Sequence, residues 1–174
     1  MRRPALRSPA PLTAGLLVAA LAACGGPADD APIAADNATS PATPGTLRDP
    51  ASGAPCAGRD VHVTRDAFRI VLDGACGAVL VTASRGAINV DHATSLRVAG
   101  DHVTVLNRRV GDVEVTGSDN TLNLTEAGEV RIGGDRNTVL ARNVTSVEFE
   151  GAGNTVDPSN APDVHDDGRD NRVL

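Results

Sequence analysis

The chain has 174 residues and is 41% hydrophobic, but it contains only two aromatic residues, Phe68 and Phe149, and all 16 basic residues are arginine. At this length we expect one domain, with a core built from Val, Leu, Ile and Ala instead of rings. So few aromatics argue against stacking platforms for sugars or bases. A formal charge of −6 gives no electrostatic reason to expect a nucleic-acid partner.

The N-terminus has the features of a bacterial lipoprotein signal peptide, which we assign to residues 1–23. Three arginines precede an apolar run at 12–23 (LTAGLLVAALAA). This run is shorter than the ~20 residues of a membrane-spanning helix but suits a secretory signal. Residues 21–24 (LAAC) resemble a lipobox, in which the cysteine is lipidated and becomes the new N-terminus. We therefore expect a lipid on Cys24; the alternative is an ordinary signal peptide cleaved after Ala22 or Ala23.

A lipid on Cys24 would make the membrane a partner, because each buried CH₂ group adds about 0.8 kcal/mol of membrane affinity. Gly25 follows the cysteine, where an aspartate would favour the inner membrane of a Gram-negative cell. We expect a cell-envelope protein anchored at the outer membrane or facing the periplasm. Residues 24–55 contain six Pro, eight Ala and four Gly, and they predict a disordered tether between the anchor and the domain.

From residue 96 onward the sequence repeats every 17 residues, with the consensus V-x-V-x-G-x-x-N-T-V-x-L. The repeat contains a glycine column and an asparagine column, which are Gly100, Gly117, Gly134, Gly151 and Gly168, and Asn120, Asn137, Asn154 and Asn171. On both sides of these positions apolar residues alternate with polar ones, which is the periodicity of strands. A fixed period of this kind is typical of a solenoid.

The repeat predicts an all-β domain at 56–174, a parallel β-helix (β-solenoid) of six to seven short turns with three sides. We expect the glycines to adopt positive φ at a corner. The asparagines tolerate the same conformation and are expected to form an amide ladder between turns. A stack of antiparallel hairpins is the second interpretation. The Asp-rich stretch 157–170 is expected to cap the C-terminal end.

Charged residues also fall into columns. One outward column alternates in sign, so each neighbouring pair is expected to attract: Arg97, Glu114, Arg131, Glu148 and His165. In a second column Asp112 and Glu129 stack between Ser95 and Ser146. A cation could relieve their repulsion, but so could Arg108 or Arg109. The sequence leaves this cation open.

Residues 56–174 resemble the bacterial Domain of Unknown Function 3060 family. The resemblance rests on the Cys56 and Cys76 pair, on the segment 74–81 (GACGAVLV), and on Gly-Ser-Asp-Asn-Thr-type cores at 117–121, 134–138 and 151–155. Similarity to this family implies a secreted or lipid-anchored protein with Val-rich repeats, and it implies no catalytic residues. Val103 departs from the pattern because it stands where an asparagine is expected, and Asp166 and Arg172 depart from it in the last row.

Cys56 and Cys76 are about one turn apart in the 17-residue register, and Cys76 shares an inward column with Ala93. This spacing, together with an oxidising envelope, predicts a disulfide that staples the first turn. Two free buried thiols or a metal pair are the alternatives.

We expect no cofactor, no metal and no catalytic residues, because the four histidines lie in different columns or distant rows and no catalytic motif occurs. The sequence therefore predicts a non-catalytic envelope lipoprotein that displays its β-solenoid as a structural or binding module. Its partner would be an envelope protein or a glycan. The alternative is a carbohydrate-active β-helix enzyme or a binder of cell-wall glycan.

Overall fold

A computed structural model describes residues 45–174. The expected signal peptide, Cys24 and the expected tether up to residue 44 lie outside the described residues. Within the described part no helix is long and apolar enough to cross a membrane.

The described residues form eleven strands and every strand pair is parallel. The strands are β1 (Leu47–Arg48), β2 (Ala54–Pro55), β3 (Val61–Val63), β4 (Arg69–Val81), β5 (Gly86–Val98), β6 (Val103–Val115), β7 (Thr121–Ile132), β8 (Thr138–Phe149), β9 (Thr155–Pro158), β10 (Asp163–Asp166) and β11 (Arg172–Val173).

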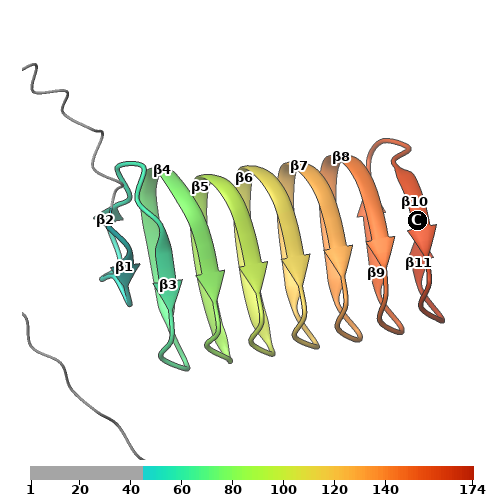
Figure 1. The fold of residues 1–174 in the computed structure, drawn as a ribbon, viewed down its shortest axis with the longest axis horizontal. Helices are drawn as coiled ribbons and strands as arrows, with labels where there is room; N and C mark the ends of the chain where they lie inside the picture. The colour runs from blue at the N-terminus through green and yellow to red at the C-terminus, as the bar shows by residue number, and fades with distance from the viewer. Residues whose placement is uncertain (1–44) are drawn as a thin grey trace, which may run out of the picture. The chain divides into compact units, whose positions relative to one another are not determined.

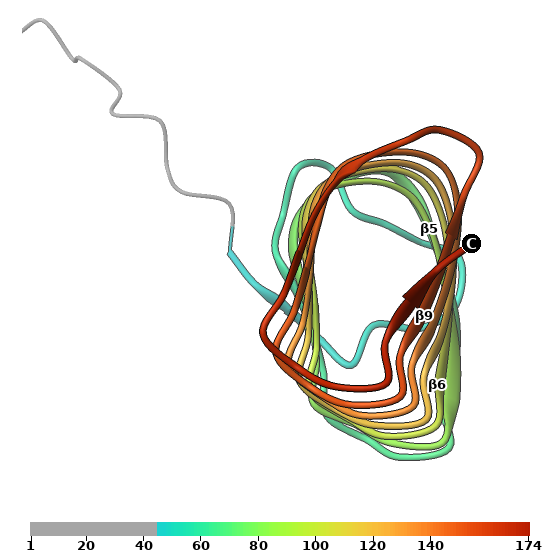
Figure 2. The same cartoon turned by 90° about the vertical axis from the view of Figure 1, so that its right-hand side faces the viewer.

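These strands wind into a β-solenoid of about seven turns, as the repeat predicts (Figure 1). One long strand supplies most of each central turn, and a short unpaired corner such as 116–120 joins it to the next strand. From β5 to β9 every paired residue has its partner 17 positions later, as Val113 does with Val130. Viewed along the stack, successive turns superpose on a common outline (Figure 2). Parallel pairing rules out the stack of antiparallel hairpins.

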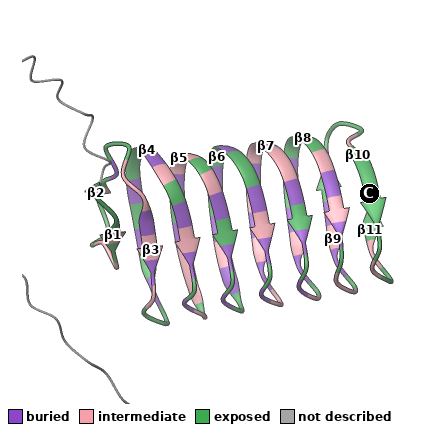
Figure 3. Ribbon diagram, viewed as in Figure 1, coloured by how far each residue is buried: buried purple, intermediate pink, exposed green. Residues whose placement is uncertain are grey.

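The interior is narrow and filled by the apolar columns. Valines and leucines such as Val115, Leu122 and Val139 are fully buried, and buried segments recur from turn to turn (Figure 3). Phe149 is buried in the column that also holds Val115 and Ile132. A thin interior of this kind has room for aliphatic side chains and few rings, which explains the composition of the chain.

One boundary differs from the expectation. Paired structure begins at Leu47 instead of Cys56, because β1 pairs with β3 and β2 pairs with β4. The last part of the expected tether therefore covers the first turn. At the other end the solenoid continues through the Asp-rich stretch 157–170, and β10 is in the predicted register, with Val164 beside Val147.

Candidate functional site

The glycine column lies at the corner that follows the V-x-V segment, but the reason for glycine differs from the expected one. None of the five glycines has positive φ. A Cβ atom on Gly134 would instead overlap the carbonyl oxygen of Gly117 one turn earlier, and the same holds for each member of the column. Glycine is therefore required by close approach of the backbone between turns. The expectation of a left-handed glycine is wrong.

The left-handed residue of this corner stands directly before each asparagine. Asp119 has a φ of 58°, and Arg136 a φ of 53°. In the next turn Gly153 occupies this position with a φ of 67°. At position 153, therefore, glycine avoids the strain that another residue would suffer at positive φ.

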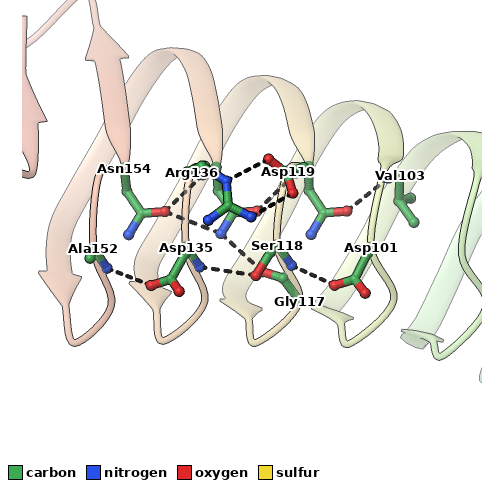
Figure 4. Close-up of polar contacts among 11 residues, drawn as sticks. Asp101, Val103, Gly117, Ser118, Asp119, Asp135, Arg136, Ala152 and Asn154 are labelled. Carbon is green, nitrogen blue, oxygen red and sulfur yellow. Dashed lines mark hydrogen bonds and ion pairs between the residues drawn. The ribbon is translucent and has the colours of Figure 1, made fainter.

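The asparagines form the predicted ladder (Figure 4), and Asn120, Asn137 and Asn154 are buried. The backbone N–H of Asn137 donates to Oδ1 of Asn154 at 2.8 Å, and the N–H of Asn154 donates to Oδ1 of Asn171 at 2.9 Å. The Nδ2 atoms of Asn137 and Asn154 donate to the carbonyl oxygens of Gly117 and Gly134. Each amide thus supplies partners for backbone groups that the strands leave unpaired at the corner.

A second ladder at the same corner was not predicted (Figure 4). Oδ1 of Asp101 accepts from the N–H of Ser118 at 2.7 Å, and Oδ1 of Asp135 accepts from the N–H of Ala152 at 2.8 Å. In the alternate turns a serine hydroxyl accepts this hydrogen bond: the N–H of Asp101 donates to Oγ of Ser84 at 3.1 Å. Alternating Asp with Ser keeps carboxylates two turns apart. The 17-residue spacing of these residues was the signal that could have revealed the ladder.

Exposed ion pairs also connect neighbouring turns. Arg136 donates two hydrogen bonds to Asp119, at 2.9 and 2.8 Å. The hydrogen bond from Arg136 lowers the pKa of Asp119. On another side Arg109 donates to Glu126 at 2.6 Å, which lowers the pKa of the Glu126 carboxyl and raises that of Arg109.

Cys56 and Cys76 form the predicted disulfide, with their Cα atoms 4.8 Å apart. Both cysteines are buried in the first turns. The bond excludes free thiols and a metal pair at these two residues.

The candidate binding site is a groove on the face formed by the V-x-V segments, which we call the charged groove. Its first hollow has a volume of about 440 Å³ and a second hollow of about 370 Å³ adjoins it, because Glu129 and Arg131 line both. The walls are two outward columns, one with Ser95, Asp112, Glu129 and Ser146, the other with Arg97, Glu114, Arg131 and Glu148. The groove therefore crosses several turns along the stack.

The sign-alternating column of the groove is in the predicted register. Arg97 donates to Glu114 at 2.8 Å, and Arg131 donates to Glu148 at 2.7 Å. His165 stands in register beside Glu148 as predicted, and its Nε2 atom lies 3.1 Å from Oδ2 of Asp167.

Asp112 and Glu129 are neighbouring side chains in the groove, and an arginine compensates their charge. Oε1 of Glu129 accepts from Arg131 at 2.9 Å, so the compensating arginine is neither Arg108 nor Arg109. Oδ1 of Asp112 accepts a long bond of 3.4 Å from the N–H of Glu129. Among residues 45–174 no group of three or more His, Cys, Asp or Glu side chains is arranged to hold a metal ion.

The corners with Gly-Ser-Asp-Asn-Thr-type cores lie in a stretch that is similar to a known family. The model of the family described as "Protein of unknown function (DUF3060)" matches residues 115–170. The resemblance to DUF3060 is confirmed. A search of curated proteins and a search of solved structures each found no match.

The DUF3060 match is shorter than the expected range of 56–174 and begins after the disulfide-bonded turns. It contains the three Gly-x-x-Asn corners that begin at Gly117, Gly134 and Gly151, and with them most of both ladders. It also contains the part of the charged groove around Glu129 and Arg131. The hydrogen bonds of these corners keep the turns in register, which holds the groove residues in line.

Proposed function

We propose that this protein is a non-catalytic lipoprotein of the cell envelope, anchored through Cys24 at the outer membrane or facing the periplasm. Its β-solenoid binds an extended partner along the charged groove. The observation that carries the proposal is the continuity of the groove, whose two hollows share Glu129 and Arg131. A ligand that follows the stack would meet the same pair of wall columns in each turn.

The chemistry of the groove favours binding over catalysis. Glu114 and Glu148 each accept a hydrogen bond from an arginine. Both carboxylates are therefore already paired with a cation inside the groove, as the charged groups of a binding surface are.

The chemistry of the walls points to a protein segment as the partner. Arginines and glutamates alternate from turn to turn, so the groove offers both signs of charge at regular intervals along its length. An extended peptide with charged side chains of both signs complements these alternating charges. A glycan would have to be held by hydrogen bonds alone, because the groove has no aromatic lining.

Crosslinking pull-downs from cell envelopes test the proposal. Arg131→Ala should lower recovery of the partner, since it removes the cation shared by both hollows. Arg136→Ala is the matched control, because Arg136 also pairs with a carboxylate but lies at the corner outside the groove. Equal recovery with both variants would contradict binding in the groove, and recovery of glycan instead of protein would contradict the peptide partner. Cys24→Ala should release the protein from membranes; membrane retention of that variant would contradict the anchor.

A further inference from the structure

A stripe of apolar and amide side chains runs along the face built from the T-V-x-L segments, away from the charged groove. The column consists of Val71, Asn89, Leu106, Asn123, Leu140 and Asp157, paired in register from β4 to β9. Val71 is 45% exposed, Leu106 44% and Leu140 40%, which is unusual for large apolar side chains in the middle of a regular sheet. We call these six residues the Leu/Asn stripe.

We infer that the Leu/Asn stripe is the docking surface for a second copy of this chain, in a parallel dimer whose two-fold axis runs along the stack. Rotation about that axis places each stripe residue opposite itself. Leu106 then meets Leu106 and Leu140 meets Leu140, while Asn123 meets Asn123 and can exchange amide hydrogen bonds. Each apolar residue thus faces an apolar residue and each asparagine faces an asparagine, without any shift of one copy along the stack. The pattern is therefore self-complementary.

The columns beside the stripe support the same symmetry. The rotation brings one flank of the stripe against the opposite flank of the copy. One flank is a column of Arg69, Ala87 and then threonines. The other flank, two residues after the stripe, has Asp73 and Asp91 at its N-terminal end and Arg108 and Arg142 further along. Arg69 therefore faces the acidic end of the other copy at both edges of the interface. Only Asp157 meets its own charge, and it lies at the outer end of the stripe.

A parallel arrangement also suits chains held by one membrane, and this part of the argument rests on the proposed anchor. Both copies present Gly45 at the same end, so both chains enter the solenoid from one side. The stripe from Val71 to Leu140 crosses five rows, or roughly 20 Å at ~4.8 Å per row. This is short for a standard interface, which buries about 800 Å² per partner. The dimer is therefore weak in solution and strengthened when a membrane concentrates both copies.

Cysteine crosslinking of the full-length protein in isolated envelopes tests the dimer. Asn89→Cys and Asn123→Cys each place a thiol on the proposed axis, and a short bis-maleimide should join each to its own counterpart. Asn143→Cys, an exposed asparagine outside the stripe, is the matched control and should give no dimer. Self-crosslinking at both stripe positions is expected only for the parallel arrangement. An antiparallel pair would place at most one row opposite itself, so crosslinking at only one of the two overturns the proposal.

A second variant separates docking from folding. Leu106→Asn combined with Leu140→Asn, in the Asn123→Cys background, should abolish the crosslink. The fold tolerates asparagine in this column, because Asn89 and Asn123 already alternate with the apolar residues. Crosslinking that survives this change, or no crosslinking at Asn89 and Asn123 above the Asn143 control, overturns the proposal. Arg131→Ala should leave the crosslink unchanged, so failure of the groove and failure of the stripe are distinguishable.

Discussion

The backbone N–H of Asn137 and its Nδ2 atom both donate to the Oδ1 atom of Asn154 one turn later, at 2.8 and 3.1 Å. Both residues are buried, so water does not compete for these groups. One side chain per turn thus connects two corners and also engages the carbonyl oxygen of a glycine. This relationship holds successive turns in the same register.

Replacing Asn137 by leucine should destabilise the protein strongly. The change leaves the N–H of Asn120 and the carbonyl oxygen of Gly117 without their partners in a buried corner. Each lost partner costs about 1–3 kcal/mol of the free energy of unfolding. Urea denaturation followed by circular dichroism measures the change. Asn143→Leu, on an exposed asparagine, is the control and should have little effect; equal effects would contradict the role of the ladder.

Gly134→Ala should destabilise the protein although the φ of Gly134 is not positive. The added Cβ overlaps the carbonyl oxygen of Gly117, and forcing apart close-packed backbones costs typically about 1–3 kcal/mol. Gly45→Ala is the matched control, because no atom lies within 4 Å of the position of its Cβ. The midpoint of thermal unfolding should fall for Gly134→Ala and remain unchanged for Gly45→Ala. A neutral Gly134→Ala would show that the turns can separate at this corner.

Much of this corner follows from the sequence, but the physical role of the glycines does not. A 17-residue period identifies which residues become neighbours, and it led to the asparagine ladder and to the Cys56–Cys76 pair. It does not show where the backbone carbonyl of each turn points, so the contact between Gly134 and Gly117 was mistaken for a need for positive φ. The Asp101 and Ser118 ladder had the same period and was overlooked because its residue type alternates.

Reduction of the Cys56–Cys76 disulfide should lower the stability of the first turns. The bond closes a segment with a sequence separation of 20, and chain-entropy estimates for loops near this size give about 3 kcal/mol. Denaturation midpoints with and without reductant should differ for the wild type and agree for a Cys56→Ala, Cys76→Ala double variant. Labelling of unreduced protein with a thiol reagent should find neither cysteine reactive, and two reactive thiols would contradict the bond.

Stability should also fall at acid pH through Asp49, which closes the N-terminal turn. Hydrogen bonds from the backbone and the hydroxyl group of Thr64 lower the pKa of Asp49 from 3.8 to about 2. Because the folded value lies below the unfolded one, the stabilisation is present above pH 3.8 and is lost as the pH falls toward about 2. Asp49→Asn should flatten this part of the profile. An unchanged slope between these pH values would contradict the assignment to Asp49.

Site-specific photocrosslinking in living cells tests the central claim, binding in the charged groove, most directly. A photoreactive amino acid at position 114 lies in the groove, whereas one at position 126 lies outside it. The two positions are matched, because Glu114 and Glu126 each accept a hydrogen bond from an arginine one turn earlier. We predict a defined protein adduct from position 114 and none from position 126. Adducts from position 126 alone, or equal adducts from both, would contradict the groove as the binding site.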